Sequence, residues 1–302
     1  MLTRRTLGRM ALGAIPSYMA TAKINSKLHG VQFGLQSYSF NTLPRAGLLD
    51  TVIRCMVETG LGECDIFEPL IQPEELSERI RSGGRGAEAQ AARAELTKWK
   101  QSVSLDYFRG IRAKFAKAGI DLWGYSGASG STDEQLKRNL EIGQALGVKL
   151  VTLAVGMEAA KRLVPIAEQA KMTIGLQGNP SMRASNPDTI AKPEQFAAAT
   201  ALSKNFKISF DIGDATGGGY DNVLQFLKDQ HEKIALLYVK DRKKDNTSVP
   251  WGEGDTPVKE VLQLVRDKKW PIRCYVDNDY KSSLTRAEDV KRSYEFAKKA
   301  LG

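Results

Sequence analysis

From residue 31 onward, short β-rich runs alternate regularly with helical segments, and this alternation constrains the fold more than any other feature of the chain. Runs that are apolar almost throughout, such as 149–154, favour parallel strands covered by helices, because both faces of such a strand are buried. The predicted strands are residues 31–36, 64–67, 120–125, 149–154, 172–177, 206–211, 234–239 and 272–277.

The segments between these runs carry helix-end signals. Residues 132–135 and 285–288 form capping boxes, and Gly147 suits the end of the helix that follows the first of them. Pro257 is placed for the first position of a helix, whereas Pro165 lies inside 157–170 and predicts that this helix starts there or kinks.

Eight strand–helix units in about 270 residues predict a single-domain (β/α)8 TIM barrel. The alternative is a doubly wound sheet. That fold usually has a glycine-rich turn after its first strand, and residues 36–40, Gln-Ser-Tyr-Ser-Phe, contain no glycine. The segment 70–106 follows the second strand and includes a soft Ser-Gly-Gly-Arg-Gly-Ala run at 82–87. We expect this insertion to lie over the barrel mouth as a partial lid.

Residues 1–22 have the features of an export signal of the twin-arginine type. Arg4 and Arg5 stand in a Thr-Arg-Arg-Thr-Leu run, a short apolar stretch follows, and residues 20–22 offer an Ala-Thr-Ala cleavage site. The alternative is a basic amphipathic first helix. Removal of the signal would leave a barrel domain of residues 23–302, located in the periplasm or otherwise exported.

Composition narrows the function classes. With two histidines and three cysteines, the chain cannot form a His-rich zinc centre, and it offers no disulfide scaffold. The net charge of +9 is spread along the chain, which favours an exposed basic face over a nucleic-acid site. No apolar run reaches the length of a transmembrane helix, and an oligomer is compatible with the sequence.

A TIM barrel carries its active site at the carboxyl ends of its strands, and several polar side chains stand there in this sequence. Asp277 and Asp279 are two residues apart, so both should point to the same face if the strand continues. The strand-end residues, in chain order, are Gln36, Glu68, Tyr125, Gln177, Asp211 with Asp214, Tyr238 with Lys240, and Asp277 with Asp279.

Five motifs resemble the sugar phosphate isomerase/epimerase family, whose fold is the xylose isomerase-like TIM barrel. They are residues 62–69, 210–214, 238–242, 276–280 and the Pro-Trp-Gly-Glu-Gly-Asp-Thr-Pro run at 250–257. The resemblance covers residues 31–301 and implies a sugar isomerase or epimerase. Exported members with twin-arginine leaders are common in this family, which agrees with residues 1–22.

The resemblance also implies a divalent metal, held by a Glu or His on strand five, an Asp on strand six, a His on strand seven and a Glu on strand eight. Asp211 matches this pattern, but Gln177, Tyr238 and Asp277 replace the other three ligands. A glutamine cannot accept a proton as a base, so Gln177 breaks the family's two-base relay. Asp214 stands where a further histidine is common.

The remaining oxygen donors, Asp211, Asp214, Asp277 and the Gln177 carbonyl, suit one hard cation such as Mg²⁺, Mn²⁺ or Ca²⁺. The alternative is that no metal binds and that Lys240 or Arg242 neutralises the aspartates as ion pairs.

Two functions follow from the resemblance. In the first, the protein is an isomerase or epimerase, or a related keto-sugar lyase, that acts on a small sugar through an enediolate. Asp277 is then the base and Lys240 the electrostatic stabiliser. In the second, it is a non-catalytic sugar-binding or partner subunit that has lost the metal. The predicted substrate-binding residues are Glu68, Trp123, Tyr125, Tyr238, Trp251 and Asp279.

Overall fold

In the computed structural model, which describes residues 22–128 and 130–302, parallel strands close into a barrel surrounded by helices. The predicted (β/α)8 barrel is confirmed. The eight barrel strands are β2 (Val31–Gln36), β3 (Glu63–Phe67), β4 (Asp121–Ala128), β5 (Leu150–Leu153), β6 (Thr173–Leu176), β7 (Phe206–Asp211), β8 (Ile234–Val239) and β11 (Arg273–Val276). They pair in chain order, and β11 closes the ring by pairing with both β8 and β2.

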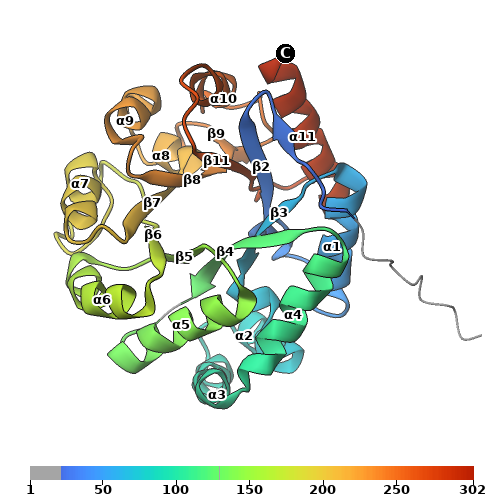
Figure 1. Cartoon of the computed structure of the whole chain (residues 1–302), viewed down its shortest axis with the longest axis vertical. Coiled ribbons are helices and arrows are strands. Elements are labelled where there is room, and N and C mark those ends of the chain that lie inside the picture. Colours follow the sequence, from blue (N-terminus) through green and yellow to red (C-terminus); the bar gives the residue numbers. More distant parts are fainter. Residues whose placement is uncertain (1–21, 129) are drawn as a thin grey trace, which may run out of the picture.

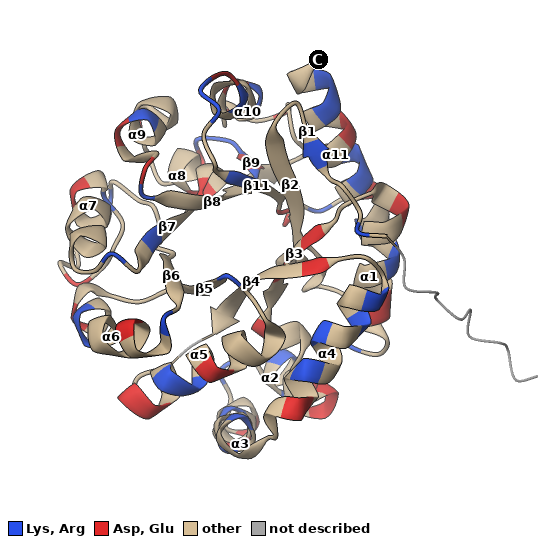
Figure 2. Cartoon of the chain, in the orientation of Figure 1, with Lys and Arg blue, Asp and Glu red and all other residues tan. Residues whose placement is uncertain are grey.

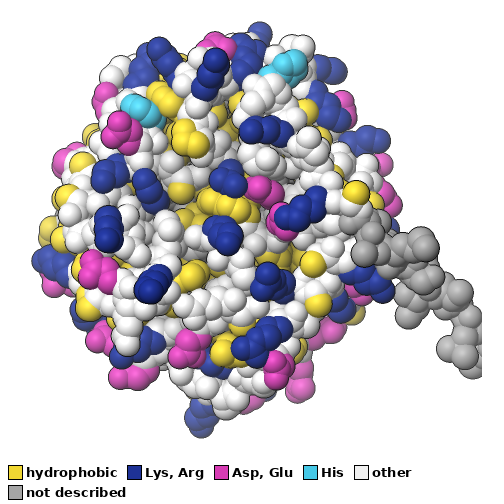
Figure 3. Space-filling model, viewed as in Figure 1, with side chains coloured by type: hydrophobic (Ala, Val, Ile, Leu, Met, Phe, Trp, Pro, Cys, Tyr) yellow, Lys and Arg dark blue, Asp and Glu magenta, His cyan; other side chains and the backbone are white. Residues whose placement is uncertain are grey.

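Helices cover the outside of the barrel (Figure 1). They are α1 (Leu48–Thr59), α4 (Leu105–Lys117), α5 (Asp133–Leu146), α6 (Met157–Ala170), α7 (Pro193–Ala201), α9 (Val223–Gln230), α10 (Val258–Asp267) and α11 (Arg286–Leu301), whereas the short α8 (Ile212–Gly217) follows the end of β7 inside this ring. Their apolar faces pack on the outer face of the strands and form the main core. Lys and Arg side chains lie on helices, loops and strands and mix with Asp and Glu over the visible surface (Figures 2 and 3).

The helix-end predictions are largely confirmed. The Thr132 side chain accepts from the Gln135 N–H at the start of α5, Gly147 ends that helix with φ 73°, and Thr285 and Glu288 form a capping box at α11. Pro257 is the residue before the first position of α10. The helix α6 runs from Met157 to Ala170 with Pro165 inside it, so it does not start at the proline.

The segment 70–106 forms a helical hairpin, α2 (Glu74–Gly83) and α3 (Ala87–Ser102), which lies at the rim of the barrel near α4 and α5 (Figure 1). Short elements complete the fold: the 3-10 turns Ser37–Phe40 and Glu68–Leu70, the strand β1 (Lys27–Leu28) paired with β2, and the pair β9 (Asp241–Arg242) and β10 (Ser248–Val249). None of the described helices is long and apolar enough to cross a membrane. The predicted export signal lies outside the described residues except for its last position.

Strand register brings the predicted site residues to one level of the barrel. Asp211 of β7 is paired with Tyr238 of β8, and Tyr238 is paired with Tyr275 of β11. Lys240 and Asp277 each follow these paired tyrosines by two residues. The ends of β7, β8 and β11 therefore deliver Asp211, Lys240 and Asp277 to the same side of the barrel mouth.

Candidate active site

The centre of the candidate site is the ammonium group of Lys240. Its Nζ lies 3.0 Å from Asp211 Oδ2, 3.2 Å from Asp277 Oδ2 and 3.6 Å from Asp279 Oδ2. The ring of Tyr38 completes the enclosure, with its centroid 5.3 Å from Nζ. Only 9% of the Lys240 side chain is exposed, so these contacts replace most of the water around its charge.

Local structure fixes each aspartate. Asp211 ends β7 and caps α8, because its Oδ1 accepts the Asp214 N–H at 2.8 Å. The Asp277 N–H donates to Val239 O, which ties the end of β11 to the end of β8. Asp277 and Asp279 both contact Lys240, as their two-residue spacing predicts.

Arg242 extends the cluster outward. Its Nη2 lies 2.6 Å from Asp279 and 2.9 Å from Asp214, so Asp279 joins the two cations. The cluster thus holds four carboxylates, Asp211, Asp214, Asp277 and Asp279, against two basic side chains. One alternative from the sequence is that Lys240 or Arg242 forms ion pairs with the aspartates. Both residues form such ion pairs in the structure.

Burial and charge shift the pKa values in this cluster. Burial opposes the charge on Lys240, yet the surrounding aspartates raise its pKa well above the usual range. Burial raises the pKa of Asp277 to about 8, against the opposing effect of Lys240, and raises the pKa of Asp211 to about 6 with help from the Asp214 charge. Burial opposes ionisation of Asp279 as well, but Lys240 and Arg242 hold its pKa below the usual range.

A second buried cluster lies at the end of β3. Glu68 Oε2 accepts from Lys100 Nζ at 2.7 Å and from the Tyr125 hydroxyl at 2.8 Å, and Glu68 Oε1 accepts from Gln72 Nε2 at 2.9 Å. Through these bonds Glu68 and Tyr125, which the sequence predicts to bind substrate, attach α3 of the insertion to the barrel. Lys100 was not predicted, because a lysine on a charged helix gives no sequence signal for burial.

Tyr238 points into the barrel rather than into its mouth. It is fully buried, and its hydroxyl donates to Asp65 Oδ2 at 2.5 Å. Burial raises the pKa of Asp65 to about 7. Gly124 leaves room for Asp65, because a Cβ at this position would lie 2.8 Å from the Asp65 Cγ. Asp65 was also missed, although an aspartate within the strand run Glu-Cys-Asp-Ile-Phe is a signal for a buried polar contact.

The two tryptophans predicted to bind substrate do not join the cluster. Trp123 packs 4.0 Å from the guanidinium of Arg273, which begins β11, so Trp123 lies at the amino end of the barrel, opposite Asp277. It stands near the start of β4, which extends beyond the predicted end to Ala128. Trp251 is buried against Phe296 of α11.

The run 250–257 is organised by Asp241, the residue that follows Lys240. The Asp241 carboxylate accepts the N–H of Gly252 at 2.7 Å, of Gly254 at 3.0 Å and of Thr256 at 3.2 Å. Gly254 is needed for this approach, because a Cβ there would lie 2.2 Å from Asp241 Oδ1. These contacts give the most specific sequence motif a structural role beside the site.

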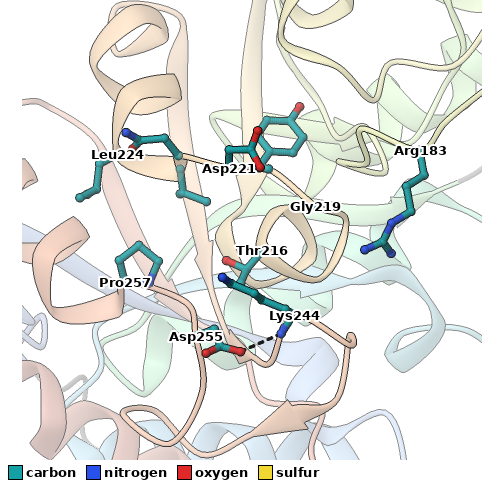
Figure 4. Close-up of a pocket in the computed structure, with 11 residues that line it drawn as sticks. Arg183, Thr216, Gly219, Asp221, Leu224, Lys244, Asp255 and Pro257 are labelled. Atoms are coloured by element: carbon teal, nitrogen blue, oxygen red, sulfur yellow. Dashed lines mark hydrogen bonds between the residues drawn. The ribbon is translucent and has the colours of Figure 1, made fainter.

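Two cavities open beside the cluster. One of 350 Å³ reaches it through Asp214 and Arg242 and is also lined by Asn179 and Arg183. The other, of 470 Å³, lies around the start of α9 between Arg183 and Lys244 (Figure 4). A small ligand could therefore reach Asp214 and Arg242 from the side of β6 and α8.

The sequence model of the xylose isomerase-like TIM barrel family matches residues 81–300. The chain belongs to this family. Solved structures with the same fold share little sequence with it, and no curated protein matches it. The probable 3-DHS dehydratase AsbF from Bacillus anthracis is 13% identical, with a TM-score of 0.61 over 88% of this chain and 98% of that one.

Two further structures with this fold are of sugar enzymes. A sugar phosphate isomerase/epimerase from Parabacteroides distasonis ATCC 8503 is 17% identical, with a TM-score of 0.59 over 92% of this chain and 97% of that one. L-ribulose 3-epimerase is 13% identical, with a TM-score of 0.61 over 90% of this chain and 94% of that one. At these identities the likeness shows the shared fold.

The residues of this xylose isomerase-like barrel do not fit the metal that the family resemblance implies. The ammonium of Lys240 lies between Asp211 and Asp277, and the Gln177 side chain bonds to neither. In the described part of the chain, no group of three or more His, Cys, Asp or Glu residues is arranged to hold a metal ion. The predicted cation set of Asp211, Asp214, Asp277 and Gln177 is therefore not assembled around a free position.

Proposed function

We propose that this protein converts a small neutral sugar or sugar derivative through an enediolate, with Lys240 and Asp277 as its catalytic residues. The observation that supports this most strongly is the ammonium of Lys240 within 3.2 Å of Asp211 and Asp277 at the carboxyl ends of β7, β8 and β11. This is the end of a TIM barrel where catalytic residues sit. Family membership, and neighbours titled as sugar epimerases, support the substrate class.

The chemistry requires one base and one fixed positive charge. Asp277 Oδ1 is buried without a hydrogen-bond partner, and in the ionised form of this carboxyl group it can accept a proton from the carbon next to a carbonyl group. As that C–H bond breaks, its electron pair forms the carbon–carbon double bond of the enediolate and the carbonyl oxygen becomes an oxyanion. Lys240 stabilises this oxyanion by its charge. The hydroxyl proton on the second carbon's oxygen then moves to the oxyanion, the carbon–oxygen double bond re-forms at that second carbon, and Asp277 delivers its proton to the former carbonyl carbon.

A single base favours isomerisation over epimerisation. Epimerisation through opposite faces needs a second proton-transfer group, and Gln177 at the strand-five position cannot supply one. An aldose–ketose isomerisation can move its proton on one face of the enediolate, which Asp277 alone can serve. We therefore propose interconversion of an aldose and a ketose as the first reaction to test.

The charge balance of the cluster favours a neutral substrate. Even with Asp277 protonated, Asp211, Asp214 and Asp279 outnumber Lys240 and Arg242, so a phosphate group next to them would face a surplus of negative charge. Neutral hydroxyl groups can instead donate to Asp214 and Asp279, the two aspartates that keep some exposure.

The test is proton exchange. We expect the protein in D2O to exchange the hydrogen next to the carbonyl of at least one neutral aldose or ketose, which ¹H NMR measures directly. Asp277→Asn and Lys240→Met should abolish this exchange. Lys207→Met is the matched control, because Lys207 lies at the start of β7, the strand that ends in Asp211, and bonds only to a backbone carbonyl. Exchange that survives in Asp277→Asn would contradict the assignment of the base.

A second candidate function is sugar binding without turnover. It is favoured by the burial of Asp211 and Asp277. Both side chains are almost fully buried and paired with Lys240, which leaves little of either carboxyl group exposed to a substrate. Sugars that raise the melting temperature of the wild-type protein but show no exchange in D2O would support this function and exclude the enzyme.

We also propose that the protein is exported and that residues 1–22 are removed. Intact-mass analysis of the periplasmic fraction should then give a chain that begins near Lys23. A protein that keeps its first residues and stays in the cytoplasm would contradict export.

A further inference from the structure

The ammonium of Lys240 lies where the family resemblance places a divalent metal. The resemblance places that metal between the strand-six aspartate and the strand-eight carboxylate, which are Asp211 and Asp277 in this chain. These two side chains make the shortest contacts of the Lys240 ammonium, at 3.0 and 3.2 Å, and Asp279 adds a third carboxylate at 3.6 Å.

We infer that the ammonium of Lys240 takes the place of the divalent cation, so that the native protein excludes a metal from this site, and that loss of this one side chain creates a metal site. The inference goes beyond the proposed function, because it concerns ion binding and holds for a sugar-binding protein as well as for an enzyme.

Electrostatics makes the two cations mutually exclusive. A divalent ion between Asp211 and Asp277 would lie within a few ångströms of the ammonium, where two positive charges repel strongly in a buried setting. Lys240 cannot easily move away, because its side chain is 9% exposed and enclosed by three aspartates and the Tyr38 ring. A metal could enter only if this lysine left a position that its carboxylate partners stabilise.

The carboxylates that remain after removal of the lysine match a hard cation. Asp211, Asp277 and Asp279 each place a carboxylate oxygen within 3.6 Å of the present ammonium position, and Asp277 Oδ1 has no hydrogen-bond partner. Oxygen–calcium distances are roughly 2.3–2.6 Å, so the three carboxylates must close in by roughly 0.4 to 1.3 Å from their present distances to Nζ. Such closure is feasible because Asp277 and Asp279 follow the end of β11 and are not part of a strand.

Lys100 provides a matched comparison within the same molecule. It is also a buried lysine in an ion pair, but it faces one carboxylate, Glu68, at 2.7 Å. Removal of Lys100 therefore leaves a single acidic ligand, which is too few for a stable divalent-cation site. A general effect of removing a buried lysine should appear in both variants, whereas a latent metal site should appear only at Lys240.

The test uses the full chain as Lys240→Met, Lys100→Met and wild type, each freed of metal with EDTA and then given millimolar MnCl2, MgCl2 or CaCl2. We expect Lys240→Met to gain about 5 °C or more in melting temperature with at least one ion. Wild type and Lys100→Met should change by less than a fifth of that gain. The double variant Lys240→Met with Asp277→Asn should lose most of it. A Lys240→Met variant that gains no more than Lys100→Met would overturn the inference.

Direct Mn²⁺ binding to the wild-type protein gives a second, independent test. Electron paramagnetic resonance should show that free Mn²⁺ stays free when wild-type protein is added. Stoichiometric Mn²⁺ binding that Asp211→Asn abolishes would overturn the inference even if Lys240→Met failed to fold. Neither result depends on turnover, so failure of the proposed isomerase activity would leave this inference standing, and the reverse also holds.

Discussion

The barrel mouth contains two buried lysines, and the comparison between them shows that counter-charges, more than burial, set the state of a buried cation. Lys240 faces aspartates at the ends of β7 and β11, and they raise its pKa well above the usual range. Lys100 faces only Glu68, and burial lowers its pKa because one partner offsets the lost hydration incompletely. The first lysine is held as a permanent charge, whereas the second mainly attaches a helix.

Of the variants that test this comparison, Lys240→Met in metal-free buffer should lose the most stability. Removal of the cation leaves Asp211 and Asp277 buried next to each other without compensation, so we expect a loss of about 5 kcal/mol in the free energy of unfolding. Urea denaturation at neutral pH measures this loss. A loss below that of Lys100→Met would show that the aspartates do not depend on Lys240.

Asp65 sharpens the comparison, because it is a buried carboxyl group without a cation beside it. Its pKa of about 7 in the folded protein, against an ordinary value of 3.8, means that the folded state keeps a proton that the unfolded state loses. Below pH 4 both states hold this proton, and the full stabilising contribution of Asp65 is present. As the pH rises toward 7, the free energy of unfolding falls by up to about 4 kcal/mol, because only the unfolded state releases the proton.

The variant Asp65→Asn should lack this fall. We expect the stability of wild type relative to Asp65→Asn to decrease between pH 4 and pH 7 and to level off above that, as measured by denaturation at several pH values. A difference that stays constant over this range would contradict a protonated Asp65 in the folded protein.

Lys100→Met should have a smaller effect. Glu68 keeps the hydrogen bonds from Tyr125 and Gln72, so the loss should be about 2 kcal/mol. Glu68→Gln, which keeps the shape of the side chain, should cost a similar amount in denaturation experiments. A loss as large as that of Lys240→Met would mean that the insertion is a structural part of the barrel.

The smallest effect concerns the turn between α2 and α3. We propose that the segment 70–106 covers the barrel mouth and is more mobile than the barrel, so limited proteolysis should cut first around residues 83–86 without unfolding the protein. Lys100→Met should speed this cleavage, because it releases α3 from Glu68. First cleavage within a barrel strand–helix unit would count against a lid.

The barrel, its strands and most helix ends are predictable from sequence, because apolar runs, capping boxes and glycines act over a few residues. The grouping of Asp211, Lys240 and Asp277 follows from strand ends in the same way. What the sequence cannot specify is the direction in which a side chain leaves its strand and which distant partner it meets. Tyr238 therefore points inward to Asp65, Glu68 meets Lys100, and Trp123 lies at the opposite end of the barrel.

The carboxylate of Asp241 also has a consequence for motion near the site. It holds the N–H groups of Gly252, Gly254 and Thr256, although these residues belong to a loop rather than to a helix or sheet. Their amide hydrogens should exchange with solvent slowly, on the timescale of barrel opening rather than of loop fluctuation. Since Asp241 adjoins Lys240, the loop should become disordered together with the contacts of the Lys240 ammonium. One amide-exchange measurement would then report on the stability of both.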